Sequence, residues 1–228
     1  WSPRTGVLVV LAWLFLLGGT RRVVSWQLVD VAKDPLLLVG PAGLLALLGR
    51  AVQQEALRRR TVFAWLVAGF SVICVIAVVN PEQGGIVTGL AGLLFWLVPM
   101  LWFWVGRGLL DNRLLDRVVV LTAVAGVVSA VHGLATTALG FPAWDTQWIR
   151  DRGYIALYVG GHHASRPFGV AASAVEFGLI VALGAFLVAL FAAAALRRLQ
   201  WSQFAITGAA LVVCLVALAV SGVRTAVV

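Results

Sequence analysis

Apolar stretches of bilayer-spanning length follow one another along almost the whole sequence. A membrane-spanning helix needs about 20 apolar residues, with a range of about 17–25. Hydrophobic residues make up 62% of the 228 residues and charged residues only 11%, whereas soluble domains are about half apolar and about a quarter charged. A soluble fold could not bury this much apolar surface. The sequence therefore predicts an all-α, polytopic transmembrane helical bundle, with spans at 6–19, 35–49, 61–79, 85–105, 118–139, 170–196 and 202–221.

These seven spans are expected to form a single transmembrane domain over residues 1–228. Residues 22–34 either extend the second span or lie in the membrane interface, where Trp26 would be favourable. The sequence begins at Trp1 and stops inside an apolar run at Val228. We therefore expect a fragment of a longer protein, incomplete at its C-terminus.

The distribution of basic residues predicts the orientation. With seven spans, ten Lys and Arg residues fall on the N-terminal side and six in the loops of the other side. This bias favours an N-terminus inside the cell and a multi-pass protein of the bacterial cytoplasmic membrane. Residues 140–169 then form an outside loop. The basic residues are spread over several loops and form no single basic face, so no nucleic-acid partner is expected.

Four arginines are expected at the outer face, and they suit an anionic ligand. Arg166 precedes Pro167, which fits the first turn of a helix, so the sequence places Arg166 at the mouth of the sixth span. Arg224 lies about 33 Å along the last span from its inner end. With Arg150 and Arg152, they could hold a phosphate or carboxylate group. The alternative is arginines that only reach to lipid headgroups.

Two side chains are the candidates for proton transfer. Glu176 is expected about ten residues into the sixth span, roughly 15 Å from its start, where a carboxylate is costly and usually serves a cavity or a partner. It is either a general base or a structural hydrogen-bond partner. His163 lies near the outer interface and could titrate near neutral pH, or it could simply be a polar loop residue.

Aromatic residues of the outside loop have two interpretations, and metal ligands are not indicated. Trp144 and Tyr154 could stack on sugar rings, or they could belong to an interfacial aromatic belt. The two cysteines lie in the middle of apolar runs, and no C-x-x-C or H-E-x-x-H pattern occurs. We expect no metal and no cofactor.

Several stretches resemble the O-antigen ligase and polymerase superfamily. In order along the chain they are NPEQGGIVTGLAGLLFWLVPMLWFWVGR (80–107), VHGLATTALGFPAWD (131–145), ASRPFGVAASAVEFG (164–178) and SGVRTAVV (221–228). The third is similar to the family's R-x-x-G entry into a helix, and the fourth to its S-x-x-R motif. The family's large outer loop would lie beyond Val228.

The resemblance implies an enzyme, a membrane glycosyltransferase of polysaccharide biosynthesis in the cell envelope. Such enzymes polymerise or ligate glycan units carried on a polyprenyl pyrophosphate, at the outer face of the cytoplasmic membrane. The partners would be the lipid-linked glycan donor, a glycan or lipid acceptor, and the bilayer. Arg166 and Arg224 match the family's arginine positions and would bind the pyrophosphate.

Two other classes of protein remain open from the sequence. Outward-facing arginines and an intramembrane glutamate would also serve a secondary transporter or flippase for an anionic lipid-linked molecule or small solute. A scaffold subunit without chemistry is the third possibility. It predicts that Arg166 and Arg224 tolerate substitution.

Overall fold

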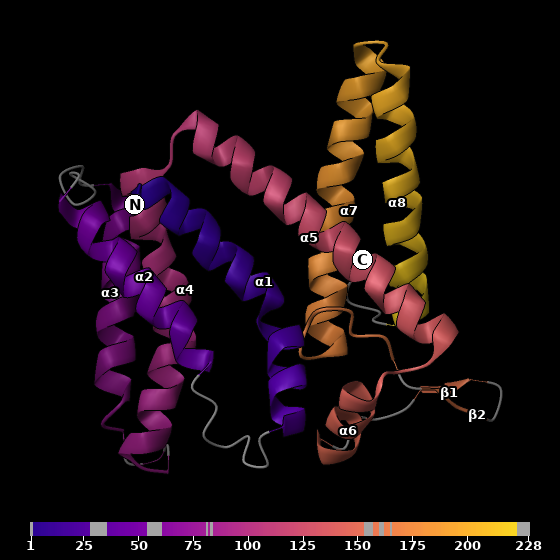
Figure 1. Cartoon of the computed structure of the whole chain (residues 1–228). Helices are drawn as coiled ribbons and strands as arrows, with labels where there is room; N and C mark the ends of the chain where they lie inside the picture. The colour runs from indigo at the N-terminus through magenta and orange to yellow at the C-terminus, as the bar shows by residue number, and fades with distance from the viewer. Residues whose placement is uncertain are drawn as a thin grey trace. The chain divides into compact units, whose positions relative to one another are not determined.

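The protein is almost entirely helical, as a computed structural model shows (Figure 1). The structure describes residues 2–27, 36–53, 61–80, 82, 84–152, 157–159, 162–164 and 166–222. The helices are α1 Pro3–Gln27, α2 Leu36–Gln53, α3 Val62–Ala77, α4 Ile86–Leu109, α5 Asn112–Leu139, α6 Ala143–Arg152, α7 Ala174–Arg197 and α8 Trp201–Ser221. A short antiparallel hairpin pairs β1 Leu157–Val159 with β2 His162–Ala164.

Five of these helices are long and apolar enough to cross a membrane. They cover Pro3–Val24, Thr88–Leu109, Asn112–Leu139, Ala174–Arg197 and Trp201–Ser221, and the stretches Leu38–Gly49 and Val62–Ala77 form shorter apolar helices. A helical membrane protein is thus the fold that the structure supports. A count of seven spans stays a prediction. Helix α1 also continues to Gln27, so residues 22–27 extend the first helix rather than the second.

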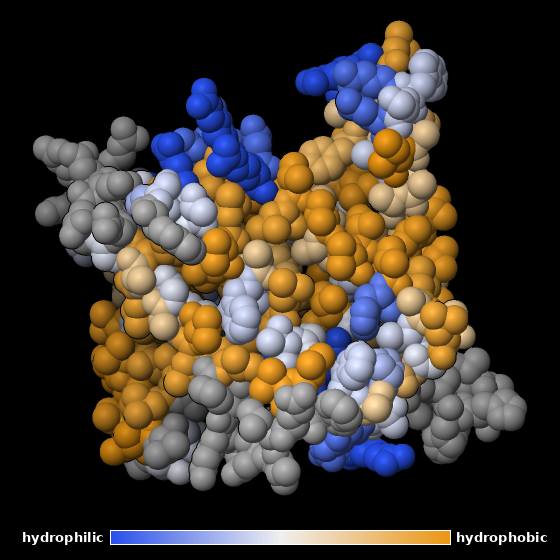
Figure 2. Space-filling model, in the orientation of Figure 1, coloured by the Kyte–Doolittle hydropathy of each residue, from blue (hydrophilic) through white to orange (hydrophobic). Residues whose placement is uncertain are grey.

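Apolar side chains face outward along the helices. Figure 2 shows hydrophobic residues over most of the visible surface and hydrophilic residues gathered toward helix ends. On α7, Leu179, Phe186 and Leu190 are each about half or more exposed. In water this surface would favour aggregation, whereas in a bilayer it meets hydrocarbon chains of the same character.

The chain divides into two compact units. The first comprises Trp1–Val10 and Leu37–Leu115, and the second Leu11–Leu36 and Asp116–Val228. In the first unit, α3 packs beside α4, and the start of α1 meets α2 through glycines. A Cβ added at Gly43 would lie 2.7 Å from the side chain of Val10. The single transmembrane domain expected from the sequence is not tested by this division.

The second unit has a core built around α7 and α8. These helices pack side by side and are joined by a tight turn, in which the N–H of Gln200 donates to the carbonyl of Ala195 at 2.9 Å. Helix α5 crosses α7 where Gly126 meets Gly184; a Cβ on Gly126 would lie 2.6 Å from the Gly184 Cα. Small residues allow two backbones to approach this closely in membrane proteins.

Candidate functional site

The R-x-x-G segment does not open a helix, contrary to the sequence prediction. Helix α7 begins at Ala174, eight positions after Arg166, and residues 166–173 have irregular backbone. Pro167 is fully buried and Phe168 is 1% exposed within the core of the second unit. Pro167 therefore packs as a core residue rather than as the first turn of a helix. Irregular backbone in a membrane protein requires such protein surroundings, because lipid offers no hydrogen bonds.

Glycines allow this segment to lie directly against α1 and α5. A Cβ on Gly18 would lie 2.3 Å from the backbone of Ala171 and Ala172, and the N–H of Gly19 donates to the carbonyl of Val170 at 2.7 Å. Gly169 has a φ of 50°, and a Cβ there would lie 2.4 Å from the Ser129 Oγ of α5. The segment is thus held through backbone contacts on both sides.

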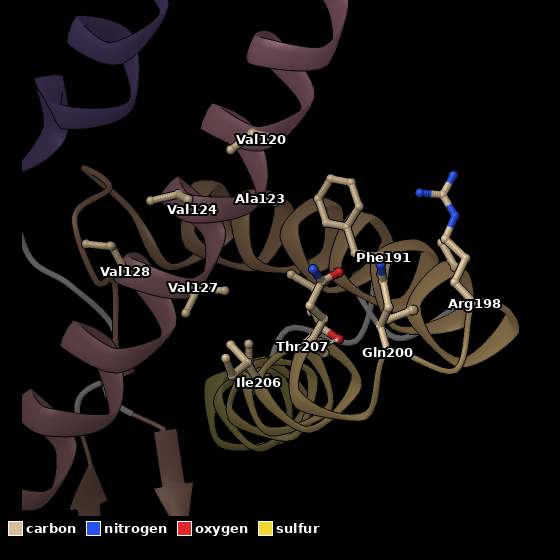
Figure 3. Close-up of a pocket in the computed structure, with 15 residues that line it drawn as sticks. Val120, Ala123, Val124, Val127, Val128, Phe191, Arg198, Gln200, Ile206 and Thr207 are labelled. Carbon is tan, nitrogen blue, oxygen red and sulfur yellow. Dashed lines mark hydrogen bonds between the residues drawn. The ribbon is translucent and has the colours of Figure 1, made fainter.

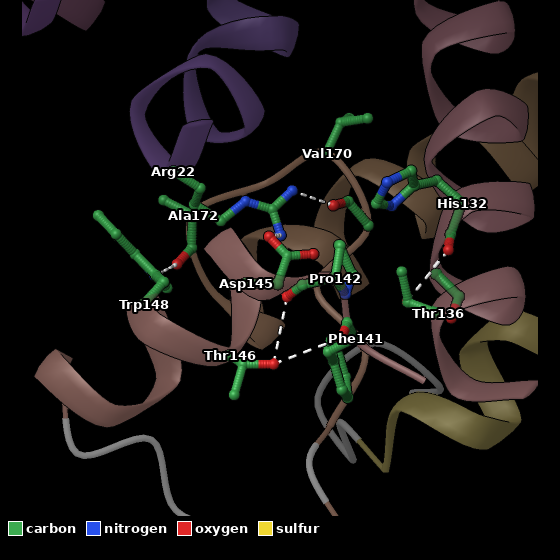
Figure 4. A network of polar contacts seen from close by, with 12 residues as sticks. Arg22, His132, Thr136, Phe141, Pro142, Asp145, Thr146, Trp148, Val170 and Ala172 are labelled. Atoms are coloured by element: carbon green, nitrogen blue, oxygen red, sulfur yellow. Dashed lines mark hydrogen bonds and ion pairs between the residues drawn. The ribbon is translucent and has the colours of Figure 1, made fainter. Parts of the chain in front are cut away.

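Arg22 of α1 links the segment to α6. Its side chain is 2% exposed, and one terminal nitrogen donates to the carbonyl of Gly169. A second nitrogen lies 3.1 Å from the carboxylate of Asp145, and the guanidinium lies over the Phe168 ring at 4.4 Å from its centre. Figure 4 shows the guanidinium beside the carboxylate of Asp145. One buried cation therefore connects α1, α6 and the irregular segment.

Asp145 is the buried anion of this cluster. It lies in the first turn of α6 and is 0% exposed. Burial raises the pKa of Asp145 above its ordinary value, and the charges of Arg22 and His132 offset part of this effect. The α6 N-terminus adds positive potential around the carboxylate. A buried charge of this kind is costly unless it is paired, so the contact with Arg22 determines whether this region can pack.

His132 of α5 points toward the same cluster (Figure 4). Its side chain is half-buried, and its Nδ1 is buried with no hydrogen-bond partner among the described residues. The structure places the ring beside an ion pair, and its Nδ1 is the atom that could bind a ligand or water.

Glu176 is not the deeply buried carboxylate that the sequence predicted. It is the third residue of α7, is exposed, and caps the helix start. Its Oε2 accepts from the N–H of Ala172 at 3.0 Å, and its own N–H donates to the Ser173 Oγ at 3.1 Å. This arrangement closely resembles a capping box. The depth estimate failed because the helix starts later than Pro167 suggested.

Arg166 is the predicted anion-binding residue that lies closest in sequence to this cluster. It is half-buried, and its Nε is buried with no hydrogen-bond partner among the residues described. It lies three positions from Gly169, whose carbonyl binds Arg22. The segment therefore carries a second cation whose Nε–H can still donate to a ligand or water.

The other predicted site residues are distributed around α6 and the hairpin. Arg150 is exposed and Trp144 is 36% exposed, both on α6. Arg152 ends α6, and His163 pairs with Tyr158 in the hairpin register. Tyr154 and Arg224 lie outside the described residues. Arg150 and Trp144 are not part of the buried cluster.

Trp148 of α6 makes a specific contact with the irregular segment. Trp148 is buried, and its Nε1 donates to the carbonyl of Ala172 at 3.3 Å. The guanidinium of Arg21 lies over its ring, 5.6 Å from the centre. Trp148 thus fastens α6 to the far end of the irregular segment.

The described residues contain no group of three or more His, Cys, Asp or Glu side chains that could hold a metal ion. The sequence expectation of a reaction without metal or cofactor stays a prediction.

Sequence reasoning missed Arg22 and Asp145 as parts of the site. In the sequence, Arg22 falls among the basic residues expected on the outer side, and Asp145 falls in the 140–169 loop. The available signal was the G-G-T-R-R run at 18–22, which joins small residues to a cation within an apolar helix. Comparison with protein-family models, curated proteins and solved structures gives no significant match for this chain.

Proposed function

We propose that this chain is part of a membrane glycosyltransferase that polymerises or ligates glycan units carried on a polyprenyl pyrophosphate. The observation that carries the proposal is the irregular segment from Arg166 to Ser173. Its backbone is fixed by the buried Arg22–Asp145 pair, while the Arg166 Nε has no hydrogen-bond partner among the described residues. A preorganised guanidinium suits a pyrophosphate, because it binds phosphate oxygens through two parallel hydrogen bonds.

The topology that fits this function has seven spans. In the second unit, α1 and α5 both contact the irregular segment in their C-terminal halves, through Gly18 and Ser129. In the first unit, Arg4 near the start of α1 pairs at 2.7 Å with Asp111, which directly precedes α5. A parallel course of α1 and α5 through the membrane would need an odd number of crossings between them. We propose that α2, α3 and α4 all cross.

Helices α2 and α3 are long enough for this role. With 18 and 16 residues they extend about 27 and 24 Å, somewhat short of a hydrocarbon core of about 30 Å. Local thinning of the bilayer accommodates this mismatch at small cost. The excess of basic residues on the N-terminal side supports the proposal that the site lies outside and the N-terminus in the cytoplasm.

The proposed reaction transfers a glycan from its lipid carrier to an acceptor hydroxyl. The hydroxyl oxygen forms a bond to the anomeric carbon, the bond from that carbon to the pyrophosphate oxygen breaks, and the hydroxyl proton passes to a base. Arg166 would stabilise the charge that develops on the leaving pyrophosphate. The sequence resemblance also implies a pyrophosphate contact for Arg224, which lies outside the described residues. His163 is the candidate base.

The transporter alternative loses one of its two sequence arguments. That argument was a glutamate inside the membrane, and Glu176 is an exposed capping residue at a helix start. The arginines remain compatible with movement of an anionic lipid. The two functions differ in their products, because an enzyme leaves a longer or transferred glycan and a transporter leaves the molecule unchanged.

Substitution of Arg166 tests the proposal. In a host in which the protein replaces the native copy, R166A and R166K are each expected to reduce surface glycan at least about tenfold, because lysine cannot make the paired contacts. Lipid-linked units should accumulate, and a gel of both pools measures this. R117A, an exposed arginine at the start of α5, is the control. Unchanged glycan in R166A at normal protein level would exclude this function.

Substitution of Glu176 separates a cap from a catalytic base. Glutamine keeps the oxygen that accepts from the Ala172 N–H, so E176Q is expected to retain surface glycan within about twofold of wild type. E176A removes the acceptor and should lower the free energy of unfolding by about 1 kcal/mol. The same gel and a denaturation curve measure the two effects. Loss of glycan in E176Q would instead make Glu176 the base.

A further inference from the structure

The second unit holds an apolar groove far from the Arg166 segment. The groove lies between α5, α7 and α8, has a volume of about 560 Å³, and is lined by α5 valines opposite residues of α7 and α8. Figure 3 shows Val124 and Val128 on one side and Ile206 and Thr207 on the other. Because α7 begins at the Arg166 segment and its last turns form this groove, the groove belongs to the opposite end of the helices.

The polar residues of the groove gather at one end. The α7–α8 turn and the first turn of α8 supply Arg198, Gln200 and Gln203. In Figure 3, Arg198 and Gln200 lie on the side away from the valines. Arg198 is exposed, and no ion pair joins it to a carboxylate within the described part of the chain. The groove is thus lined by apolar side chains over most of its length and carries a cationic side chain at one end.

The dimensions of the groove match one leaflet of a bilayer. From Val188 to Arg198 the α7 lining extends over ten residues, or about 15 Å, which is half of a hydrocarbon core of about 30 Å. The groove has a volume of about 560 Å³ and an almost wholly apolar lining, which suits an extended acyl chain.

We propose that the groove binds an anionic phospholipid of the leaflet opposite the Arg166 segment. One acyl chain would lie along the valines of α5, and Arg198 would bind the headgroup phosphate, with the glutamines donating to its oxygens. Basic residues at the ends of spans attract anionic headgroups in this way, and the apolar walls contribute through burial of the chain. This site is independent of the proposed glycan transfer and can be tested without it.

Lipid binding to the purified protein tests this site. The protein in mild detergent receives phosphatidylglycerol or phosphatidylcholine with identical chains, and native mass spectrometry counts bound lipid. Phosphatidylglycerol is expected to be retained in preference to phosphatidylcholine. R198Q is expected to weaken its binding about tenfold, the loss of one charge-assisted contact, whereas R197Q on the adjacent position leaves it unchanged.

A second matched pair tests the apolar part of the groove. A194W introduces an indole into the groove and is expected to displace the lipid, whereas A193W on the neighbouring exposed position, which does not line the groove, retains it. Equal losses in R198Q and R197Q would show only general surface attraction. Full lipid binding in a folded A194W would show that the groove is not the site. Either result overturns the proposal.

Discussion

Replacing Asp145 with alanine is expected to lower the free energy of unfolding by about 3–5 kcal/mol. The substitution leaves the guanidinium of Arg22, which is 2% exposed, without its carboxylate at 3.1 Å. A buried charge that loses its partner costs about this much. Arg22 also donates to the carbonyl of Gly169, so the 166–173 segment should loosen together with α6.

The purified protein is unfolded with an increasing concentration of a denaturing detergent. Tryptophan fluorescence then gives the change in the free energy of unfolding. D151A is the matched control, because Asp151 is an exposed carboxylate of the same helix. The double variant R22M/D145L should recover part of the stability, since both charges are removed together. Recovery stays incomplete because the Gly169 carbonyl loses its donor. A D145A variant as stable as D151A would show that the ion pair does not hold α6.

Replacing Gly18 with alanine is expected to destabilise the protein by about 1–3 kcal/mol, although alanine is the better helix former. The new methyl group would lie 2.3 Å from the backbone of Ala171 and Ala172. Backbone cannot move aside as a flexible side chain can, so α1 and the irregular segment must separate. Such overpacking typically costs this amount. Under the proposed function, surface glycan should fall with it, because Arg166 is carried by the displaced segment.

Unfolding of G18A and of a matched glycine variant measures this effect. Gly208 lies in α8, and an added Cβ there meets nothing within 4 Å. G208A should therefore gain about 0.5–1 kcal/mol from helix propensity alone. Opposite signs for the two substitutions are the expected result. A stabilised G18A would mean that the segment does not rest on α1.

The two predictions address the same physical problem from different sides. Residues 166–173 have irregular backbone, and their polar groups need partners inside the protein. Arg22 supplies one donor to Gly169, Gly19 supplies another to Val170, and Glu176 accepts from Ala172. Gly18 supplies the space for this approach. Loss of either the charge pair or the space should release the segment that presents Arg166.

The sequence by itself determined the helical class and the position of nearly every long helix. A soluble fold cannot bury several apolar runs of about 20 residues, so these runs lie in lipid. There they form helices, because the backbone must satisfy its own hydrogen bonds. Each predicted span corresponds to a helix from α1 to α5 or to α7 and α8. This information is local, which is why composition and periodicity were sufficient.

Only the tertiary structure decided what happens around Arg166. Pro167 is compatible with the first turn of a helix, and local propensity placed the helix start there. In the folded chain Phe168 and Pro167 are instead buried in the core, and the cap forms at Ser173. Long-range packing outweighed a local preference of small magnitude, and with it the depth of Glu176 changed.

The buried cluster was equally inaccessible to sequence reasoning. Arg22 and Asp145 are 123 positions apart in the sequence. Each of them alone resembles an ordinary charged residue at a membrane face. Their pairing depends on a glycine-lined approach of α1 to the irregular segment and on the start of α6 at Ala143. A charge becomes structural only where tertiary packing removes it from water and supplies its counter-ion, and one sequence does not specify which two charges will meet.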